Sequence, residues 1–107
     1  MRVLKFIVEG STIMQDPDCD FSGLFKDKDK GIRAEFSFSS DWMNTTKVIA
    51  FWSMLDVEYE PQMLDSKFGC TVPSEALARS AFKIQVFGKN SSKKMRTGKI
   101  TVRQSGR

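Results

Sequence analysis

The sequence contains no histidine, the side chain that most often transfers protons near neutral pH. Histidine-based catalytic triads and histidine-ligated metal sites are therefore excluded. Its two cysteines, Cys19 and Cys70, lie far apart and lack the CxxC spacing of zinc or thioredoxin-like motifs. We expect two free thiols in a reducing compartment, with a single disulfide as the alternative.

Long apolar runs are also missing. The amino-terminal stretch MRVLKFIVEGS is interrupted by Lys5 and followed by Glu9, so it predicts neither a signal peptide nor a membrane span. Over 107 residues, 40% are hydrophobic and 28% are charged, which is typical of a folded globular protein. We expect a single domain over residues 1–107 and no membrane partner.

Acidic residues are absent from the last third of the chain. Residues 76–107 hold nine basic residues and no acidic one, while the rest of the chain is net negative and the whole carries +4. One interpretation is a basic edge hairpin that faces solvent. The other is a surface for an anionic partner, which would be nucleic acid, an acidic protein or the acidic part of a second copy.

Motifs for catalysis and metal binding are incomplete. Asp16, Asp18 and Asp20 have the spacing of the first ligands of a calcium loop, but the required glycine and the flanking helices are missing. Glu58 and Glu60 share one face of a predicted strand, and we interpret them as a charged outer face rather than a glycosidase pair. We predict no enzymatic activity, no metal ion and no cofactor.

Alternation of apolar and polar residues recurs along the chain and predicts an all-β fold. The clearest example is IRAEFSFSS at residues 32–40, in which every second residue from Ile32 to Phe38 is apolar. The predicted strands are 2–8, 32–39, 47–55, 57–60, 68–72, 81–87 and 98–103. About seven strands is the count of a two-sheet antiparallel sandwich. The only helix expected is one short turn from Pro73 to Arg79, since proline suits a first helical position.

The two tryptophans and the last strands define a candidate interface. Trp52 is expected to pack between the sheets, whereas Trp42 either plugs one end of the sandwich or stands at an interface. If Ile84 and Val86 face the core, Phe87 points outward beside Lys83, and a neighbouring strand adds two apolar side chains to that face. The predicted interface residues are Trp42, Ile49, Phe51, Phe87, Lys83, Lys99 and Arg103.

Four motifs occur in a distinctive order: RAEFSFSSDW, KVIAFW, CTVPSEALARSAFKIQVFG and TGKITVRQSG. Their order resembles that of immunoglobulin-like domains in virion proteins of tailed bacteriophages, including baseplate, tail-fibre and head-fibre proteins. The resemblance covers about residues 31–106. The matching positions are Phe36, Phe38, Asp41, Trp42, Phe51, Cys70, Val72, Pro73, Leu77, Phe82, Ile84, Val86, Gly88, Thr97, Ile100, Val102 and Gly106.

This resemblance implies an immunoglobulin-like sandwich in which a helical turn, held by Leu77, carries the chain from one sheet to the other. It also implies a non-enzymatic virion protein, made in the bacterial host cytoplasm, that docks on capsid, tail or baseplate proteins and on copies of itself as a homo-oligomer. Because the chain ends at Arg107 without a fibrous segment, we expect docking alone and no receptor binding.

Two other functions remain open. One is a nucleic-acid-binding module that uses the acid-free stretch, with Phe87 or Trp42 stacking on bases. The other is a carbohydrate-binding module, which would need an exposed aromatic side chain such as Trp42.

Overall fold

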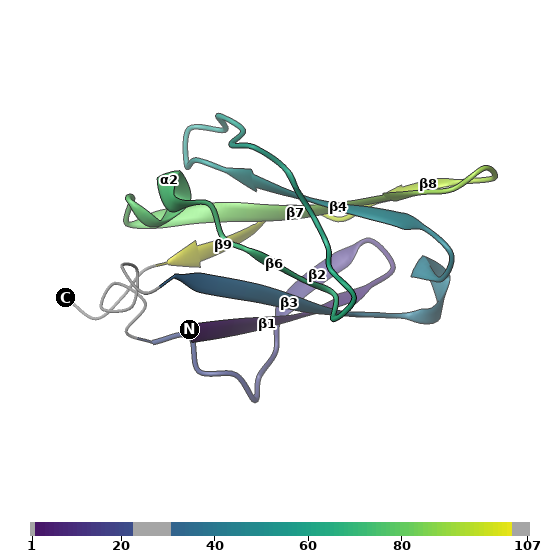
Figure 1. The fold of residues 1–107 in the computed structure, drawn as a ribbon, viewed down its shortest axis with the longest axis horizontal. Helices are drawn as coiled ribbons and strands as arrows, with labels where there is room; N and C mark the ends of the chain where they lie inside the picture. The colour runs from purple at the N-terminus through teal and green to yellow at the C-terminus, as the bar shows by residue number, and fades with distance from the viewer. Residues whose placement is uncertain (1, 23–30, 104–107) are drawn as a thin grey trace.

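The computed structural model describes residues 2–22 and 31–103, which form two β-sheets packed face to face (Figure 1). Sheet A has the order β2 (Thr12–Gln15), β1 (Arg2–Glu9), β3 (Ile32–Phe38) and β6 (Gly69–Thr71). Sheet B has the order β5 (Gln62–Met63), β4 (Thr46–Trp52), β7 (Ala81–Lys89) and β8 (Lys94–Arg96), with β9 (Ile100–Arg103) also pairing with β7. The all-β sandwich predicted from the sequence is confirmed.

Two strands were not predicted, and one lies elsewhere. β2 is too short to show clear alternation; it follows β1 through a tight turn in which Gly10 has a φ of 57°. β8 lies within the polar hairpin segment that joins the last two predicted strands. Residues 57–60 form only a single bridge, between Glu58 and Trp52, and β5 follows this segment.

One strand pair departs from the antiparallel arrangement that we expected. β1 and β3 run parallel, with Leu4 opposite Ala34 and Phe6 opposite Phe36. All other strand pairs within residues 2–22 and 31–103 are antiparallel. β2 runs antiparallel to β1 along one edge and returns the chain toward the start of β1, and β3 then runs along the other edge in the direction of β1.

Two short helical elements connect the sheets. The 3-10 helix η2 (Ser40–Trp42) leads from β3 in sheet A to β4 in sheet B. The helical turn α2 (Ser74–Leu77) leads from β6 in sheet A to β7 in sheet B, which is the crossover that the resemblance implied. Leu77 is buried within the core cluster and anchors this turn.

The core lies between the sheets and is rich in aromatic rings. Phe6 stacks on Phe36 with ring centroids 5.3 Å apart, and Phe51 lies 6.2 Å from Phe82. The largest fully buried side chains are Trp42, Phe6, Phe51, Phe82, Leu4, Ile32, Ile49, Ile84, Val8, Val72 and Val86. Burial of this apolar surface is the main favourable contribution to folding.

Thr97 lies between β8 and β9, and its hydrogen bonds attach this segment to β7. Its backbone amide donates to the Val86 carbonyl at 3.0 Å, and the Val86 amide donates back to the Thr97 hydroxyl at 3.1 Å. The hydroxyl itself donates to the Gly98 carbonyl, and the Gln85 side-chain amide donates to the Thr97 carbonyl. Thr97, one of the positions that carry the resemblance, thus hydrogen-bonds the segment between β8 and β9 to β7.

Thr97→Val is expected to lower the free energy of unfolding by about 1–3 kcal/mol, because it keeps the shape but leaves the Val86 amide without its acceptor. Urea unfolding of the purified chain measures the change. Thr12→Val on the exposed β2 makes the same chemical change and is expected to stay within about 0.5 kcal/mol of the unmodified chain. Equal losses in the two variants would contradict this role of the Thr97 hydroxyl.

Candidate docking surface on the outer face of sheet B

The register between β4 and β7 determines which side chains leave the core. Ile49 lies opposite Val86 and Phe51 lies opposite Ile84, and directly opposite residues share one face of a sheet. Ile49 and Phe51 are fully buried, so their predicted outward orientation is wrong. Since β4 is apolar on both faces, its alternation alone did not show which face is covered.

Trp42 is also part of the core. It is 0% exposed, its ring centroid lies 5.5 Å from that of Phe38, and its indole nitrogen donates to the Gly10 carbonyl at 2.9 Å. Of the two expected roles, Trp42 therefore plugs the end of the sandwich. Its burial removes Trp42 as a stacking platform for bases or sugars.

A row of side chains crosses the outer face of sheet B. Met63 of β5 lies opposite Val48 of β4, Val48 opposite Phe87 of β7, and Phe87 opposite Arg96 of β8. Met63 is 61% exposed, while Val48 and Phe87 are partly exposed. Val48 and Phe87 also line a shallow hollow of about 290 Å³. The predicted outward orientation of Phe87 is confirmed.

Trp52 lies on this outer face, not between the sheets as predicted. It is opposite Lys83 on β7, and the Lys99 ammonium lies 3.9 Å from its ring centroid. This distance is within the range of a cation–π contact. The indole nitrogen of Trp52 is buried and has no hydrogen-bond partner among the residues that the structure describes.

The two lysines of the predicted interface are bound by one carboxylate. The ammonium groups of Lys83 and Lys99 lie 3.0 Å and 3.1 Å from the same oxygen of Asp56. Their hydrogen bonds hold the pKa of Asp56 below its ordinary value. Both lysines are thus held in position and partly neutralised, whereas Arg103, the remaining predicted cation, is exposed at the end of β9.

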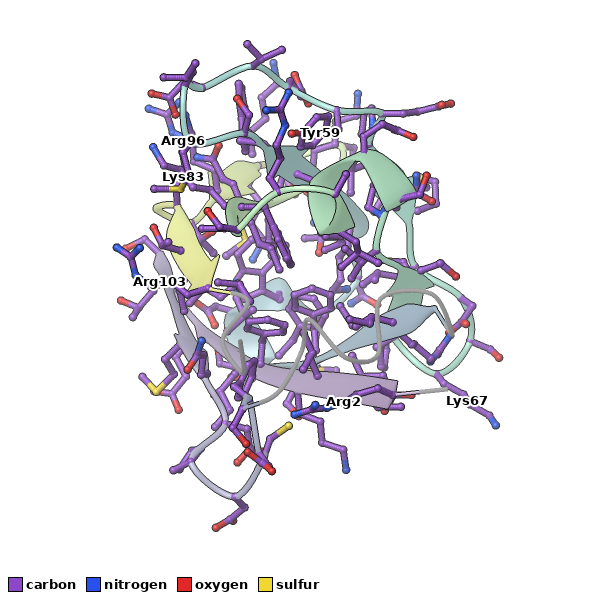
Figure 2. The ribbon with its side chains drawn as sticks, turned by 90° about the vertical axis from the view of Figure 1, so that its left-hand side faces the viewer. Arg2, Tyr59, Lys67, Lys83, Arg96 and Arg103 are labelled. Carbon is purple, nitrogen blue, oxygen red and sulfur yellow. The ribbon has the colours of Figure 1, made fainter. Side chains whose placement is uncertain are left out.

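The basic side chains of this region project from one side of the molecule. Figure 2 shows Lys83, Arg96 and Arg103 along the same side of the view, with Lys67 on the opposite side. Lys83 and Arg103 lie on neighbouring strands, one on β7 and the other on β9. The structure therefore places four predicted residues on this side of sheet B, namely Phe87, Lys83, Lys99 and Arg103, of which Lys83 and Lys99 share a partner.

An exposed apolar turn between β4 and β5 was not predicted. The Ser53 hydroxyl accepts hydrogen bonds from the amides of Leu55 and Val57, and the Asp56 amide donates to the Ser53 carbonyl. This turn, residues 54–57, presents Leu55 at 88% exposure and Val57 at 61%. The predicted strand 47–55 includes the first two residues of this turn, because apolar composition alone does not distinguish an exposed turn from a buried strand.

The other candidate motifs show a local structural role. The amides of Asp18 and Ser22 donate to the carboxylates of Asp16 and Asp20, so these acids cap their own loop. No group of three or more acidic or cysteine side chains within the described ranges is placed to hold a metal ion. No helix in the described part of the chain is long and apolar enough to cross a membrane.

The two cysteines are unbonded. Cys19 is partly exposed, whereas Cys70 is buried in the core cluster. Burial raises the pKa of the Cys70 thiol to about 12, so this group is almost entirely protonated at neutral pH. Cys70 therefore acts as a small apolar core residue.

Comparison with known proteins adds no relative: no family model, no curated protein and no solved structure matches this chain. The immunoglobulin-like family stays a prediction from the order of the sequence motifs. The case for a function therefore rests on the outer face of sheet B.

Proposed function

We propose that this protein is a non-enzymatic structural component of a tailed-phage virion, in which an immunoglobulin-like sandwich docks on a capsid, tail or baseplate protein. The observation that carries the docking role is the apolar row of Met63, Val48 and Phe87, which is flanked by basic side chains. The order of the sequence motifs supports the virion setting.

The composition of this face is that of a protein interface. Aromatic residues, methionine and arginine are enriched in interfaces, and contiguous exposed apolar patches mark interaction sites on soluble proteins. Asp56 connects the turn at residues 54–57 to the face through Lys83 and Lys99, which places Leu55 and Val57 beside it. An apolar centre with a basic rim fits a partner surface that is apolar in the middle and acidic around it.

Mass spectrometry of purified virions tests the virion setting. Particles of the phage whose genome carries this gene are expected to contain the chain in a fixed ratio to the capsid or tail proteins. Cross-linking of those particles then identifies the protein on which it docks. A gene outside any phage or prophage genome, or virions that lack the chain, would overturn the proposal.

Met63→Glu tests the docking face, because it places a carboxylate in the apolar row of the exposed edge strand β5. We expect the variant chain to dock about tenfold to a hundredfold more weakly than the unmodified chain, and its occupancy in assembled particles measures this loss. Met14→Glu is the matched control, since Met14 is an exposed methionine on the edge strand β2 of the other sheet.

The control variant is expected to bind as the unmodified chain does. Equal occupancy of both variants would show that the outer face of sheet B is not the docking surface. Equal thermal unfolding of the two variants in solution confirms that any difference comes from docking and not from folding.

A further inference from the structure

The second half of β3 forms an open sheet edge. β6 pairs with β3 only from Arg33 to Glu35, and one more hydrogen bond follows, from the Phe36 amide to the Phe68 carbonyl. Even-numbered residues of β3 bond toward β6, because the Val72 amide also donates to the Ile32 carbonyl on that side. The Phe38 amide and carbonyl therefore point past the end of β6, and no hydrogen bond to them is formed by the residues described.

A groove of about 600 Å³ runs along this open edge. Its accessible apolar side chains are Phe38, Phe68 and Met43, and it also borders the buried rings of Phe36 and Trp42. Phe68 stands against Phe38 edge to face, with ring centroids 5.8 Å apart, and it has a φ of 58°. At this residue the chain turns away from β3, which leaves the edge uncovered.

The charged part of the groove is basic. It contains Lys5, Lys47 and Lys67 and one acidic residue, Glu35. Glu35 accepts a hydrogen bond from Arg33 at 2.8 Å, so its charge is already compensated. Lys5, Lys47 and Lys67 have no ion pair with any carboxylate in the described ranges.

Lys47 is the lysine that lies deepest in the groove. Its ammonium lies 5.1 Å from the ring centroid of Phe38 and 5.6 Å from that of Phe68, and it donates to the Thr45 carbonyl. Desolvation lowers the pKa of Lys47 below its ordinary value. Inward-pointing lysines protect edge strands from indiscriminate pairing, and the same charge favours an acidic strand over any other.

We propose that this groove binds an extended acidic segment of a partner protein as an added strand beside β3. The Phe38 amide and carbonyl pair with the backbone of the segment, as in other cases of strand addition. Because side chains of a strand alternate, apolar residues of the segment enter the aromatic groove while its carboxylates meet the lysines. Charge complementarity selects this occupant.

This site is distinct from the docking face of sheet B. Lys67 lies on the opposite side of the molecule from Lys83, Arg96 and Arg103 (Figure 2). The two surfaces are therefore tested by different variants, and failure of one leaves the other in place.

The direct test is amide exchange of the full chain, followed by NMR, with and without a short blocked peptide in which glutamate and valine alternate. Exchange of the Phe38 amide is expected to slow by about tenfold or more at saturating peptide, because that amide becomes hydrogen-bonded. Two control peptides are used, one with lysine in place of glutamate and one with N-methylated backbone groups. Unchanged Phe38 exchange, or equal binding of either control peptide, would overturn the proposal.

Charge reversal provides the second test. Lys5→Glu combined with Lys67→Glu is expected to weaken peptide binding by about tenfold or more, since both side chains are exposed and line the groove. The matched control is Lys94→Glu combined with Arg96→Glu, which makes the same charge change on β8 of the other sheet. Loss of binding in the control pair alone would place the peptide on the basic face of sheet B and refute the groove.

Discussion

Trp42→Ala is expected to lower the free energy of unfolding by about 3–5 kcal/mol, the largest loss of any single substitution considered for this chain. Trp42 is 0% exposed at the end of the sandwich, and its ring packs against Phe38. Truncation leaves a large cavity and also removes the donor that satisfies the Gly10 carbonyl, at 2.9 Å from the indole nitrogen. Urea unfolding, followed by circular dichroism, measures the loss.

Trp52→Ala is the matched control, because it removes the same side chain from the outer face of sheet B. Trp52 is partly exposed, and its indole nitrogen donates no hydrogen bond to any described residue. We expect about half the loss or less, mainly from the contact with Lys99. A loss as large as that of Trp42→Ala would contradict the placement of the two tryptophans.

The contrast between these tryptophans shows what alternation can predict. In β3 and β7 large apolar residues alternate with polar ones, so their inward residues, such as Phe36 and Ile84, can be identified from spacing alone. The same spacing placed Phe87 and Lys83 on the outside. In β4 the residues on both faces are apolar, and only the pairing of Phe51 with Ile84 determines that Phe51 faces inward and Trp52 outward.

Long-range pairing also explains what sequence reasoning missed at the surfaces. The Asp56 carboxylate reaches Lys83 and Lys99, which are distant in sequence, and no local pattern encodes this cluster. The open edge at Phe38 likewise depends on where β6 ends, and β6 ends because the chain at Phe68 adopts a positive φ. Periodicity predicts that a strand exists but not which of its edges is covered.

The parallel pairing of β1 and β3 has the same cause. Each strand was predicted from its own alternation, and alternation carries no information about direction relative to a neighbour. The short β2 contributes to the arrangement, because it runs antiparallel to β1 and returns the chain toward the start of β1, from where β3 follows the other edge in the direction of β1.

Gly88→Ala is expected to destabilise the fold by about 1–3 kcal/mol, because the space beside Gly88 is filled by Trp42. A Cβ atom at Gly88 would lie 2.6 Å from Cζ3 and 2.9 Å from Cε3 of the Trp42 ring. The ring is fully buried and hydrogen-bonded to Gly10, so it cannot move aside as an exposed side chain would. Gly98→Ala is the control, since no heavy atom lies within 4 Å of the added methyl group, and we expect a change of about 0.5 kcal/mol or less.

A double-mutant cycle separates this steric cause from a general effect of replacing glycine in a strand. In a Trp42→Phe background the two indole atoms nearest to Gly88 are absent, so Gly88→Ala is expected to cost much less than in the unmodified chain. The coupling free energy should then be about 1–2 kcal/mol, measured from urea unfolding of the four proteins. Additive losses would mean that Gly88 is needed for its backbone and not for the room that it leaves to Trp42. Strong coupling would instead show that one contact between η2 and β7 closes this end of the sandwich, beside the groove that Trp42 also lines.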